Sequence, residues 1–191
     1  MKQILFATGN NTKFHTANLI CQEYGIELER LSLDIPEIQA QESEVIARDK
    51  ALRVFEELQR PVVISDDTWI IPGIGGFPGP YMKFVNGAFM PEDWLHLTAS
   101  LTDRRIILRQ IVVYQDKHQQ QLFYIDIEGV LLDEIRGKGE YPHTTVASFD
   151  GGKHSMAEVI AQGKSSLFDS GKRTTWHDLC EWLNTQDTKT N

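Results

Sequence analysis

The first 65 residues of the chain alternate between short apolar runs and segments with helical periodicity. Apolar runs of strand length lie at residues 2–7, 26–33 and 62–65, and segments with helical periodicity lie between them at residues 11–24 and 43–59. In the longer helical segment, Ala47, Ala51, Val54 and Leu58 recur on one face at a spacing of about 3.6 residues, and Pro61 ends the segment. The order strand, helix, strand, helix, strand predicts an α/β sheet with parallel or mixed pairing.

The rest of the chain has a different pattern. Two long segments with strand composition, residues 105–114 and 121–132, flank a polar turn at residues 116–119 and predict an antiparallel lobe. A glycine–proline loop is expected at residues 73–80, and helices are expected at residues 91–101 and 174–184. We therefore expect one two-lobed domain over residues 1–184, followed by a frayed tail at residues 185–191.

Composition disfavours several classes of protein. The chain has 191 residues, enough for a domain with its own core, and its net charge of −8 disfavours binding to a nucleic-acid backbone. No apolar run approaches the roughly 20 residues that span a bilayer, so no membrane partner is expected. Cys21 and Cys180 lack the spacing of metal ligands and suggest a reducing compartment. Without a signal-peptide pattern at its N-terminus, the chain is expected to be cytoplasmic.

The turn after the first strand has the features of an anion-binding site. Thr8-Gly9-Asn10 ends an apolar run, and a helical pattern with Lys13 in its first turn begins at once. A glycine turn that leads into a helix presents free backbone N–H groups and the positive end of the helix dipole. Asn10 can cap the helix, Gly9 lets a ligand approach the backbone, and Lys13 adds a positive charge. The alternative is an ordinary turn followed by a solvated lysine.

Acidic residues follow the second and third predicted strands. Asp66 and Asp67 come directly after residues 62–65, at the strand end where open α/β sheets bind ligands, and at most one of them is expected to face a given site. Glu37 lies in the loop after the second strand and is a candidate oxygen ligand for Mg²⁺. Lys50 lies beside the apolar face of the second helix, where it either follows the edge of the core or reaches a phosphate.

Several catalytic and metal-binding patterns are absent from the sequence. No two of the six histidines have the spacing of a zinc site, and there is no Gly-x-Ser-x-Gly elbow, Walker loop or Cys–His arrangement. Covalent catalysis is therefore not expected. The acidic and basic residues favour attack by water with the assistance of a metal ion.

Six segments together resemble the inosine triphosphate pyrophosphatases, which hydrolyse deaminated purine nucleoside triphosphates. The segments are Thr8-Gly9-Asn10 with Lys13, Asp34-Ile35-Pro36-Glu37-Ile38-Gln39, Lys50, Asp66-Asp67-Thr68, Gly75-Gly76-Phe77-Pro78-Gly79-Pro80-Tyr81-Met82-Lys83, and Ala157-Glu158 with Lys164. The resemblance extends from the first strand to about residue 164. It implies a long mixed sheet flanked by helices, in two lobes with a central cleft, and usually a homodimer.

The resemblance also implies a reaction and roles for individual residues. Water attacks between the α- and β-phosphates of a nucleoside triphosphate and releases a nucleoside monophosphate and pyrophosphate. The substrate-binding positions that it implies are Thr8, Gly9, Asn10, Lys13, Lys50 and Lys164. Glu37 would bind Mg²⁺, and Asp67 would be a metal ligand or the base that activates water, with Asp66 beside it as a further metal ligand. The resemblance does not say which aspartate activates the water. Lys13 and Lys50 would assist catalysis by neutralising phosphate charge.

Two motifs of that family are missing from the chain. No Phe-Gly-Trp/Tyr-Asp-Pro segment occurs around residues 139–145, and residues 168–173 replace Ser-His-Arg, where Lys172 or Arg173 can stand in for the arginine. The phosphate and metal positions are kept while the base-contacting motifs are changed, which predicts an altered base preference. Candidates for a new base pocket are His143, Tyr141 and Lys172.

Two other functions stay open at this point. One is an enzyme that uses the same carboxylates to split other nucleotides or phosphate esters. The other is a nucleotide-binding protein without catalytic activity. Retention of Lys13, Glu37, Lys50 and Asp67 argues against the second, because a pure binding protein has little need for two lysines and two acids around one phosphate cluster.

Overall fold

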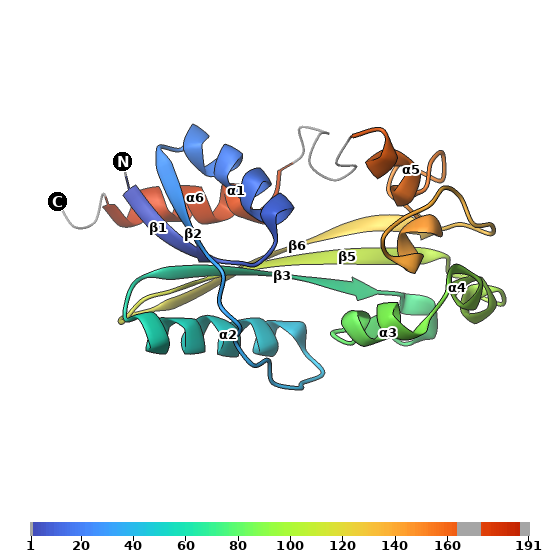
Figure 1. The fold of residues 1–191 in the computed structure, drawn as a ribbon, viewed down its shortest axis with the longest axis horizontal. Helices are drawn as coiled ribbons and strands as arrows, with labels where there is room; N and C mark the ends of the chain where they lie inside the picture. The colour runs from blue at the N-terminus through green and yellow to red at the C-terminus, as the bar shows by residue number, and fades with distance from the viewer. Residues whose placement is uncertain (1, 164–172, 188–191) are drawn as a thin grey trace. The chain divides into compact units, whose positions relative to one another are not determined.

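Figure 1 shows the computed structural model, which describes residues 2–163 and 173–187. The strands are β1 Lys2–Ala7, β2 Ile26–Leu31, β3 Val62–Ile70, β4 Pro78–Gly79, β5 Arg105–Gln115, β6 Gln120–Leu131 and β7 Ala147–Ser148. The helices are α1 Asn11–Glu23, α2 Ser43–Leu58, α3 Met82–Ala88, α4 Pro91–Thr98, α5 Met156–Ala161 and α6 Thr175–Asp187, with short 3-10 helices at Pro72–Ile74 and Pro142–Thr145. Neighbouring strands follow the order β2-β1-β3-β5-β6-β7, and β4 pairs with β3. Since β1 is parallel to β2 and β3 while β4 is antiparallel to β3, the sheet is mixed, as predicted.

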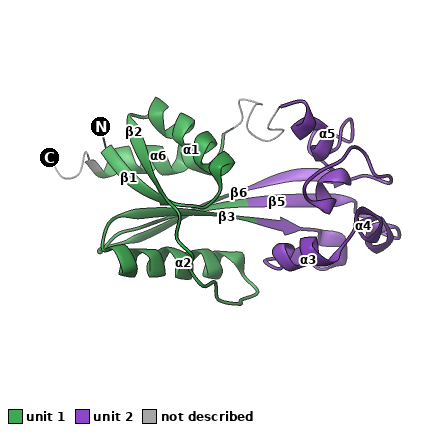
Figure 2. Ribbon diagram, in the orientation of Figure 1, with its two compact units in different colours: residues 1–67, 110–125, 173–191 green, residues 68–109, 126–172 purple. Residues whose placement is uncertain are grey.

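The chain divides into two compact units, which Figure 2 distinguishes by colour. Unit 1 comprises residues 1–67, 110–125 and 173–191, and unit 2 comprises residues 68–109 and 126–172. Strands β3, β5 and β6 each contribute residues to both units. Each unit has apolar clusters of its own.

Unit 1 has three layers, because its strands carry apolar side chains on both faces. In β1, Ile4 and Phe6 pack with helices α1 and α6, whereas Leu5 packs with α2 on the opposite face (Figure 1). Strand β3 repeats this alternation, with Val63 in the first cluster and Val62 in the second. Full burial of such a side chain contributes about 1.5–3 kcal/mol. Because apolar side chains point to both faces of these strands, helices must cover both faces to bury them.

Unit 2 is organised around aromatic side chains. Trp69 of β3 and Trp94 of α4 lie in one buried cluster with residues from α3, β5 and β6. The glycine–proline loop predicted from the sequence contains the short helix Pro72–Ile74, after which Gly75 and Gly76 have φ values of +70° and +89°. Side chains other than hydrogen are disfavoured at such angles, which explains the paired glycines.

The structure corrects several expected boundaries. Strand β3 continues to Ile70, so Asp66 and Asp67 lie inside the strand and not in a turn after it. The reason is that Trp69, four positions beyond the expected end, is buried in unit 2 and keeps the chain extended. Strands β5 and β6, expected to form an antiparallel lobe, continue the sheet next to β3, and each contributes residues to both units. Helices α3 and α5 were not predicted, and α6 continues to Asp187 into the expected tail.

Cys21 of α1 and Cys180 of α6 bring the two helices of one layer together. Both thiols are reduced and fully buried, and their Sγ atoms lie 3.5 Å apart. The hydrogen bond with the neighbouring thiol and burial raise the pKa of Cys21, so this thiol stays in the neutral form. The two cysteines therefore act as small apolar side chains in the core of unit 1.

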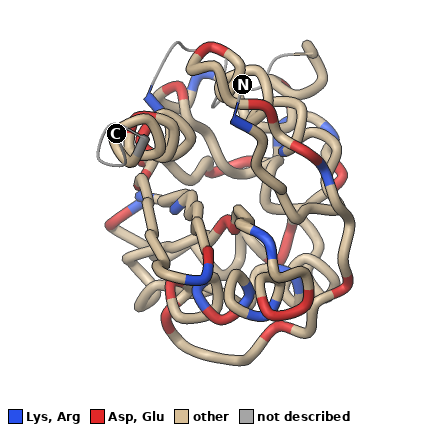
Figure 3. The backbone as a smooth tube through the Cα atoms, turned by 90° about the vertical axis from the view of Figure 1, so that its left-hand side faces the viewer, with Lys and Arg blue, Asp and Glu red and all other residues tan. Residues whose placement is uncertain are grey.

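Charged positions are interspersed over the surface. Figure 3 shows Asp and Glu positions and Lys and Arg positions scattered along the described chain. Of the helices in the described residues, none has the length and apolar character needed to cross a membrane.

Candidate active site

The turn between β1 and α1 has the cap predicted from the sequence. Asn10 Oδ1 accepts a hydrogen bond from the backbone N–H of Lys13 at 2.9 Å, and the N–H of Asn10 is donated to Thr8 Oγ1 at 3.1 Å. The first turn of α1, all of it described, contains no acidic residue. The positive end of the helix dipole therefore has no negative side chain from its own helix to offset it.

Gly9 is not required by the packing of the turn. Its φ lies outside the left-handed region, and an added Cβ would make an ordinary contact with Ser32 Oγ at 3.4 Å. Neither backbone strain nor a clash explains the glycine. Close approach of a ligand to the backbone, the role expected from the sequence, fits this geometry.

Lys13 reaches across from α1 to strand β3. Its Nζ lies 2.9 Å from Asp67 Oδ2, and each side chain is 31% exposed, so the pair is open to a ligand. Burial by itself would lower the pKa of Lys13, but the charge of Asp67, with smaller contributions from Asp66 and Glu37, outweighs burial and raises it. Lys13 is therefore fully charged at neutral pH.

A second pair of a lysine and a carboxylate involves helix α2. Lys50 of α2 donates to Glu37 Oε1 at 2.5 Å, and Glu37 lies in the loop between β2 and α2. Lys50 is thus directed to a carboxylate and does not merely follow the edge of the core. Since Glu37 also influences the pKa of Lys13, the two pairs belong to one group of charges.

Asp66 is influenced by both lysines. Its Oδ1 accepts a hydrogen bond from the N–H of Asp67 at 3.0 Å. Burial raises its pKa, and although Lys13 and Lys50 both act to lower it, burial outweighs them. Both lysines therefore lie close enough to act on one carboxylate. We call Lys13, Glu37, Lys50, Asp66 and Asp67 the charged cluster; all five belong to unit 1.

The charged cluster suits a metal ion that is shared with a substrate. Within residues 2–163 and 173–187, no group of three or more His, Cys, Asp or Glu side chains is placed to hold a metal by itself. Mg²⁺ commonly takes only one or two carboxylates and completes its shell with water and phosphate oxygens. The carboxylates of Glu37, Asp66 and Asp67 are hard oxygen donors of this kind, so the donor set fits Mg²⁺ bound together with a phosphate.

The structure does not bring every predicted substrate residue to this cluster. Arg173, just before α6, forms ion pairs with Asp178 and Glu181, each at 2.6 Å. Its guanidinium is thus directed to acids of its own helix. Lys164 and Lys172 lie outside the described residues, and the roles expected for these three side chains stay predictions.

The two described candidates for a base pocket lie in unit 2. His143 is buried, its Nδ1 is 2.9 Å from Asn86 Oδ1, and its ring meets that of Trp69 edge-on at 4.5 Å. Burial lowers the pKa of His143 to about 4, so the ring is neutral at physiological pH. Tyr141 is 47% exposed and stacks on His143. These contacts make His143 a core residue; contact with a base stays a prediction.

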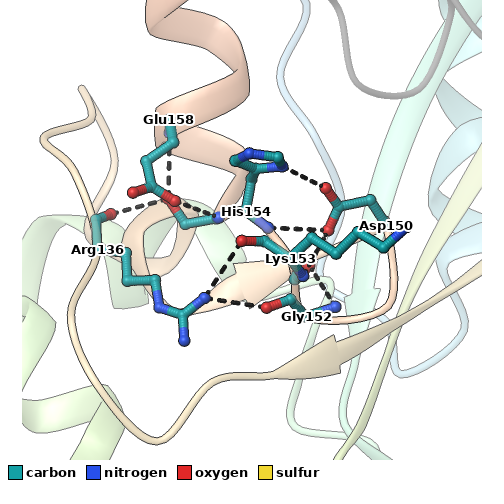
Figure 4. A network of polar contacts seen from close by, with 8 residues as sticks. Arg136, Asp150, Gly152, Lys153, His154 and Glu158 are labelled. Carbon is teal, nitrogen blue, oxygen red and sulfur yellow. Dashed lines mark hydrogen bonds and ion pairs between the residues drawn. The ribbon is translucent and has the colours of Figure 1, made fainter.

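Glu158, from the Ala157-Glu158 pair noted in the sequence, caps the start of helix α5. Ser155 and Glu158 form a capping box at α5: each side chain accepts a hydrogen bond from the other's backbone N–H, at 2.8 and 3.1 Å (Figure 4). In the preceding loop, Asp150 accepts from the N–H groups of Lys153 and His154. Glu158 therefore fixes the start of a helix in unit 2.

We call residues Thr8–Asn11 the phosphate turn, and one residue beside it, Arg30, was not predicted from the sequence. Arg30 of β2 donates hydrogen bonds to the backbone of Thr8 and Gly9 and to the side chain of Asn11. The sequence carries no signal for this contact, because it depends on the register that pairs Arg30 with Phe6, whose side chain faces α1. A residue at that register position points toward the start of α1.

Comparison with known proteins gives matches over most of the chain. The sequence model of the Ham1 family matches residues 4–172. A dITP/XTP pyrophosphatase from Methanopyrus kandleri is 31% identical over 181 residues, which cover 94% of this chain and 95% of the relative. A dITP/XTP pyrophosphatase from Methanosarcina mazei is 32% identical over 184 residues, which cover 96% and 98%. The structure of a HAM1 protein from Coxiella burnetii matches 97% of this chain and 100% of its own, with a TM-score of 0.78 and 18% identity. The predicted α/β fold is confirmed.

Proposed function

Because this chain belongs to the Ham1 family, we propose that it hydrolyses deaminated or otherwise non-standard purine nucleoside triphosphates to nucleoside monophosphate and pyrophosphate. The chain covers almost the full length of relatives named dITP/XTP pyrophosphatases. The observation that carries the proposal is the charged cluster beside the capped start of α1. Lysines, carboxylates and a helix N-terminus are the groups that phosphoryl chemistry requires, because it depends mainly on positioning and charge neutralisation.

The phosphate turn and the two lysines would hold the triphosphate. The backbone of Gly9 and Asn10 and the hydroxyl of Thr8 lie at the positive end of α1, next to Lys13. Lys13 and Lys50 are each paired with a carboxylate, and phosphate oxygens would replace or share these partners. The gain is larger for the transition state, in which charge on the phosphate oxygens is redistributed.

Phosphohydrolases of this family generally depend on a metal ion, and we propose that it is Mg²⁺ here. Glu37 and Asp67 would hold it together with the substrate phosphates, with Asp66 beside them. When bound, Mg²⁺ offsets phosphate charge and polarises a phosphoryl oxygen.

Asp66 is better suited than Asp67 to take the proton of the attacking water. Burial raises the pKa of Asp66, and a carboxylate with a raised pKa is a stronger base. Asp67 instead forms the ion pair with Lys13 at 2.9 Å and keeps that lysine in place. We therefore assign the base to Asp66 and the positioning of Lys13 to Asp67.

A panel of nucleoside triphosphates tests the proposed function. With Mg²⁺, we expect pyrophosphate release from ITP, dITP or XTP at a rate well above that from ATP, GTP, CTP and UTP. Release of orthophosphate alone would favour the divergent phosphohydrolase, and binding without any product would favour the nucleotide-binding protein. The same panel ranks the bases, which the changed motifs around residues 139–145 and 168–173 leave open.

We also propose a cytoplasmic homodimer that binds no nucleic acid or membrane. Two buried, reduced cysteines and a net charge of −8 support the compartment and the lack of a polyanionic partner. On or beside α3, Tyr81, Phe84 and Met90 are 41%, 68% and 63% exposed, and a second copy would cover such apolar side chains. Light scattering is expected to give twice the chain mass of 21.8 kDa, and a mass of one chain would contradict the dimer.

A further inference from the structure

Arg30 of β2 donates three hydrogen bonds to the phosphate turn. Its Nε donates to the carbonyl of Thr8 at 3.2 Å, one terminal nitrogen donates to the carbonyl of Gly9 at 2.8 Å, and the other donates to Asn11 Oδ1. The side chain is exposed, so burial of apolar surface does not hold it there. The planar guanidinium thus donates to three acceptors of one turn, on Thr8, Gly9 and Asn11.

The carbonyls that Arg30 holds determine where the amides of the turn point. In a trans peptide the C=O and the following N–H lie on opposite sides of the bond, and the peptide bonds of this turn are trans. With the carbonyls of Thr8 and Gly9 turned toward Arg30, the N–H groups of Gly9 and Asn10 face the other way. The N–H of Asn10 is donated to Thr8 Oγ1, which keeps that hydroxyl on the same side.

Arg30 reaches the turn because of its register in the sheet. It is the partner of Phe6 in the parallel ladder between β1 and β2, and Phe6 and Leu28 both pack in the cluster beneath α1 and α6. Its neighbour Glu29 pairs with Arg60 at 2.7 Å. Successive side chains of a strand alternate between faces, so Arg30 lies on the face where α1 begins and Glu29 on the other.

We propose that Arg30 is a positioning residue for phosphate binding: it holds two carbonyls of the Thr8–Asn11 turn so that the N–H of Gly9, and the Thr8 hydroxyl to which Asn10 donates its N–H, face the substrate. This inference rests on the proposed function, because that function assigns the turn to the triphosphate. Arg30 acts through the backbone and contributes geometry, whereas Lys13 and Lys50 contribute charge. An oriented set of backbone amides binds anions only while the peptide planes keep their direction.

Binding of inorganic tripolyphosphate with Mg²⁺, measured by calorimetry, tests the inference without requiring turnover. Arg30→Ala is expected to weaken binding by about 10- to 100-fold, the usual effect of removing a residue that orients a ligating group. Arg30→Lys is expected to lose nearly as much, because an ammonium group cannot donate to three acceptors in one plane. The matched control is Arg60→Ala, which removes an exposed arginine paired with the neighbouring position of the same strand and is expected to leave binding unchanged.

The outcomes separate this inference from the proposed function. Unchanged binding in Arg30→Ala, or full recovery in Arg30→Lys, overturns the positioning role, as does a wild-type protein that binds no tripolyphosphate. If Arg30→Ala binds tripolyphosphate more weakly than the wild type, and the wild type releases no pyrophosphate from any nucleotide, the positioning role of Arg30 is supported and only the proposed function is overturned. In turnover assays, kcat/KM is expected to fall by the same factor for every base, since the turn meets the phosphates. Equal unfolding temperatures of Arg30→Ala and Arg60→Ala show that the loss is not a folding defect.

Discussion

Lys13→Ala is expected to lower kcat/KM for nucleoside triphosphate hydrolysis by at least about 100-fold. A preorganised donor at a site of developing charge supplies about 3–4 kcal/mol, which corresponds to this factor or more. Lys13 is such a donor, because α1 carries it to within 2.9 Å of Asp67 and it stays charged at neutral pH. The measurement is initial-rate kinetics with the best substrate of the panel.

The control for Lys13 is Lys117→Ala. Lys117 is an exposed lysine in the turn between β5 and β6 of the same unit, so its removal changes the net charge equally. Its kcat/KM is expected to match that of the wild type. Near-normal turnover in Lys13→Ala would count against the assignment of the charged cluster to the phosphates. Equal losses in both variants would mean that net charge matters and that the position of Lys13 does not.

Asp66→Asn is expected to lower kcat by about 100-fold or more, because removal of a general base costs about 10²–10⁴. Asn has nearly the same shape but cannot accept a proton. Stability should not fall. Burial raises the pKa of Asp66 in the folded protein, so the ionised form at neutral pH costs folding free energy that a neutral side chain avoids. Kinetics and thermal unfolding on the same samples give both results.

Asp67→Asn separates the two aspartates. The raised pKa of Asp66 places the acid limb of kcat/KM above the ordinary aspartate pKa of about 3.9, and activity is lost as the pH falls through it. The charge of Asp67 is one cause of that raised pKa, so its removal is expected to move the limb to lower pH, and kcat also falls because Lys13 loses its partner. Loss of kcat in Asp67→Asn with a largely active Asp66→Asn would reverse the assignment.

The local parts of the site could be predicted from the sequence. Asn10 caps α1, and Lys13 lies in its first turn, because an apolar run, a glycine turn and a helical pattern follow one another within about ten residues. A helix was expected at residues 174–184, and α6 is found at Thr175–Asp187, where Trp176, Leu179, Cys180 and Leu183 are buried in unit 1. Periodicity is a local property, so these predictions required no knowledge of the tertiary structure.

The extent of β3 and the role of Arg30 could not be predicted in this way. Asp66 and Asp67 look like a turn because aspartate is common in turns, yet burial of Trp69 in unit 2 keeps them in an extended strand. The side chain of Arg30 finds its partners about twenty residues earlier in the chain. No periodic pattern reports a contact that depends on the register of two strands.

The chemical groups of the cluster were determined by the sequence alone: two lysines, three carboxylates and a glycine turn before a helix. Only the tertiary structure decided their pairing, with Lys13 bound to Asp67, Lys50 bound to Glu37 and a half-buried Asp66 under the influence of both lysines. The physical reason is that α1 and α2 cover opposite faces of the same parallel strands. Residues far apart in the chain meet at the end of those strands, and distances there depend on packing that local sequence does not encode.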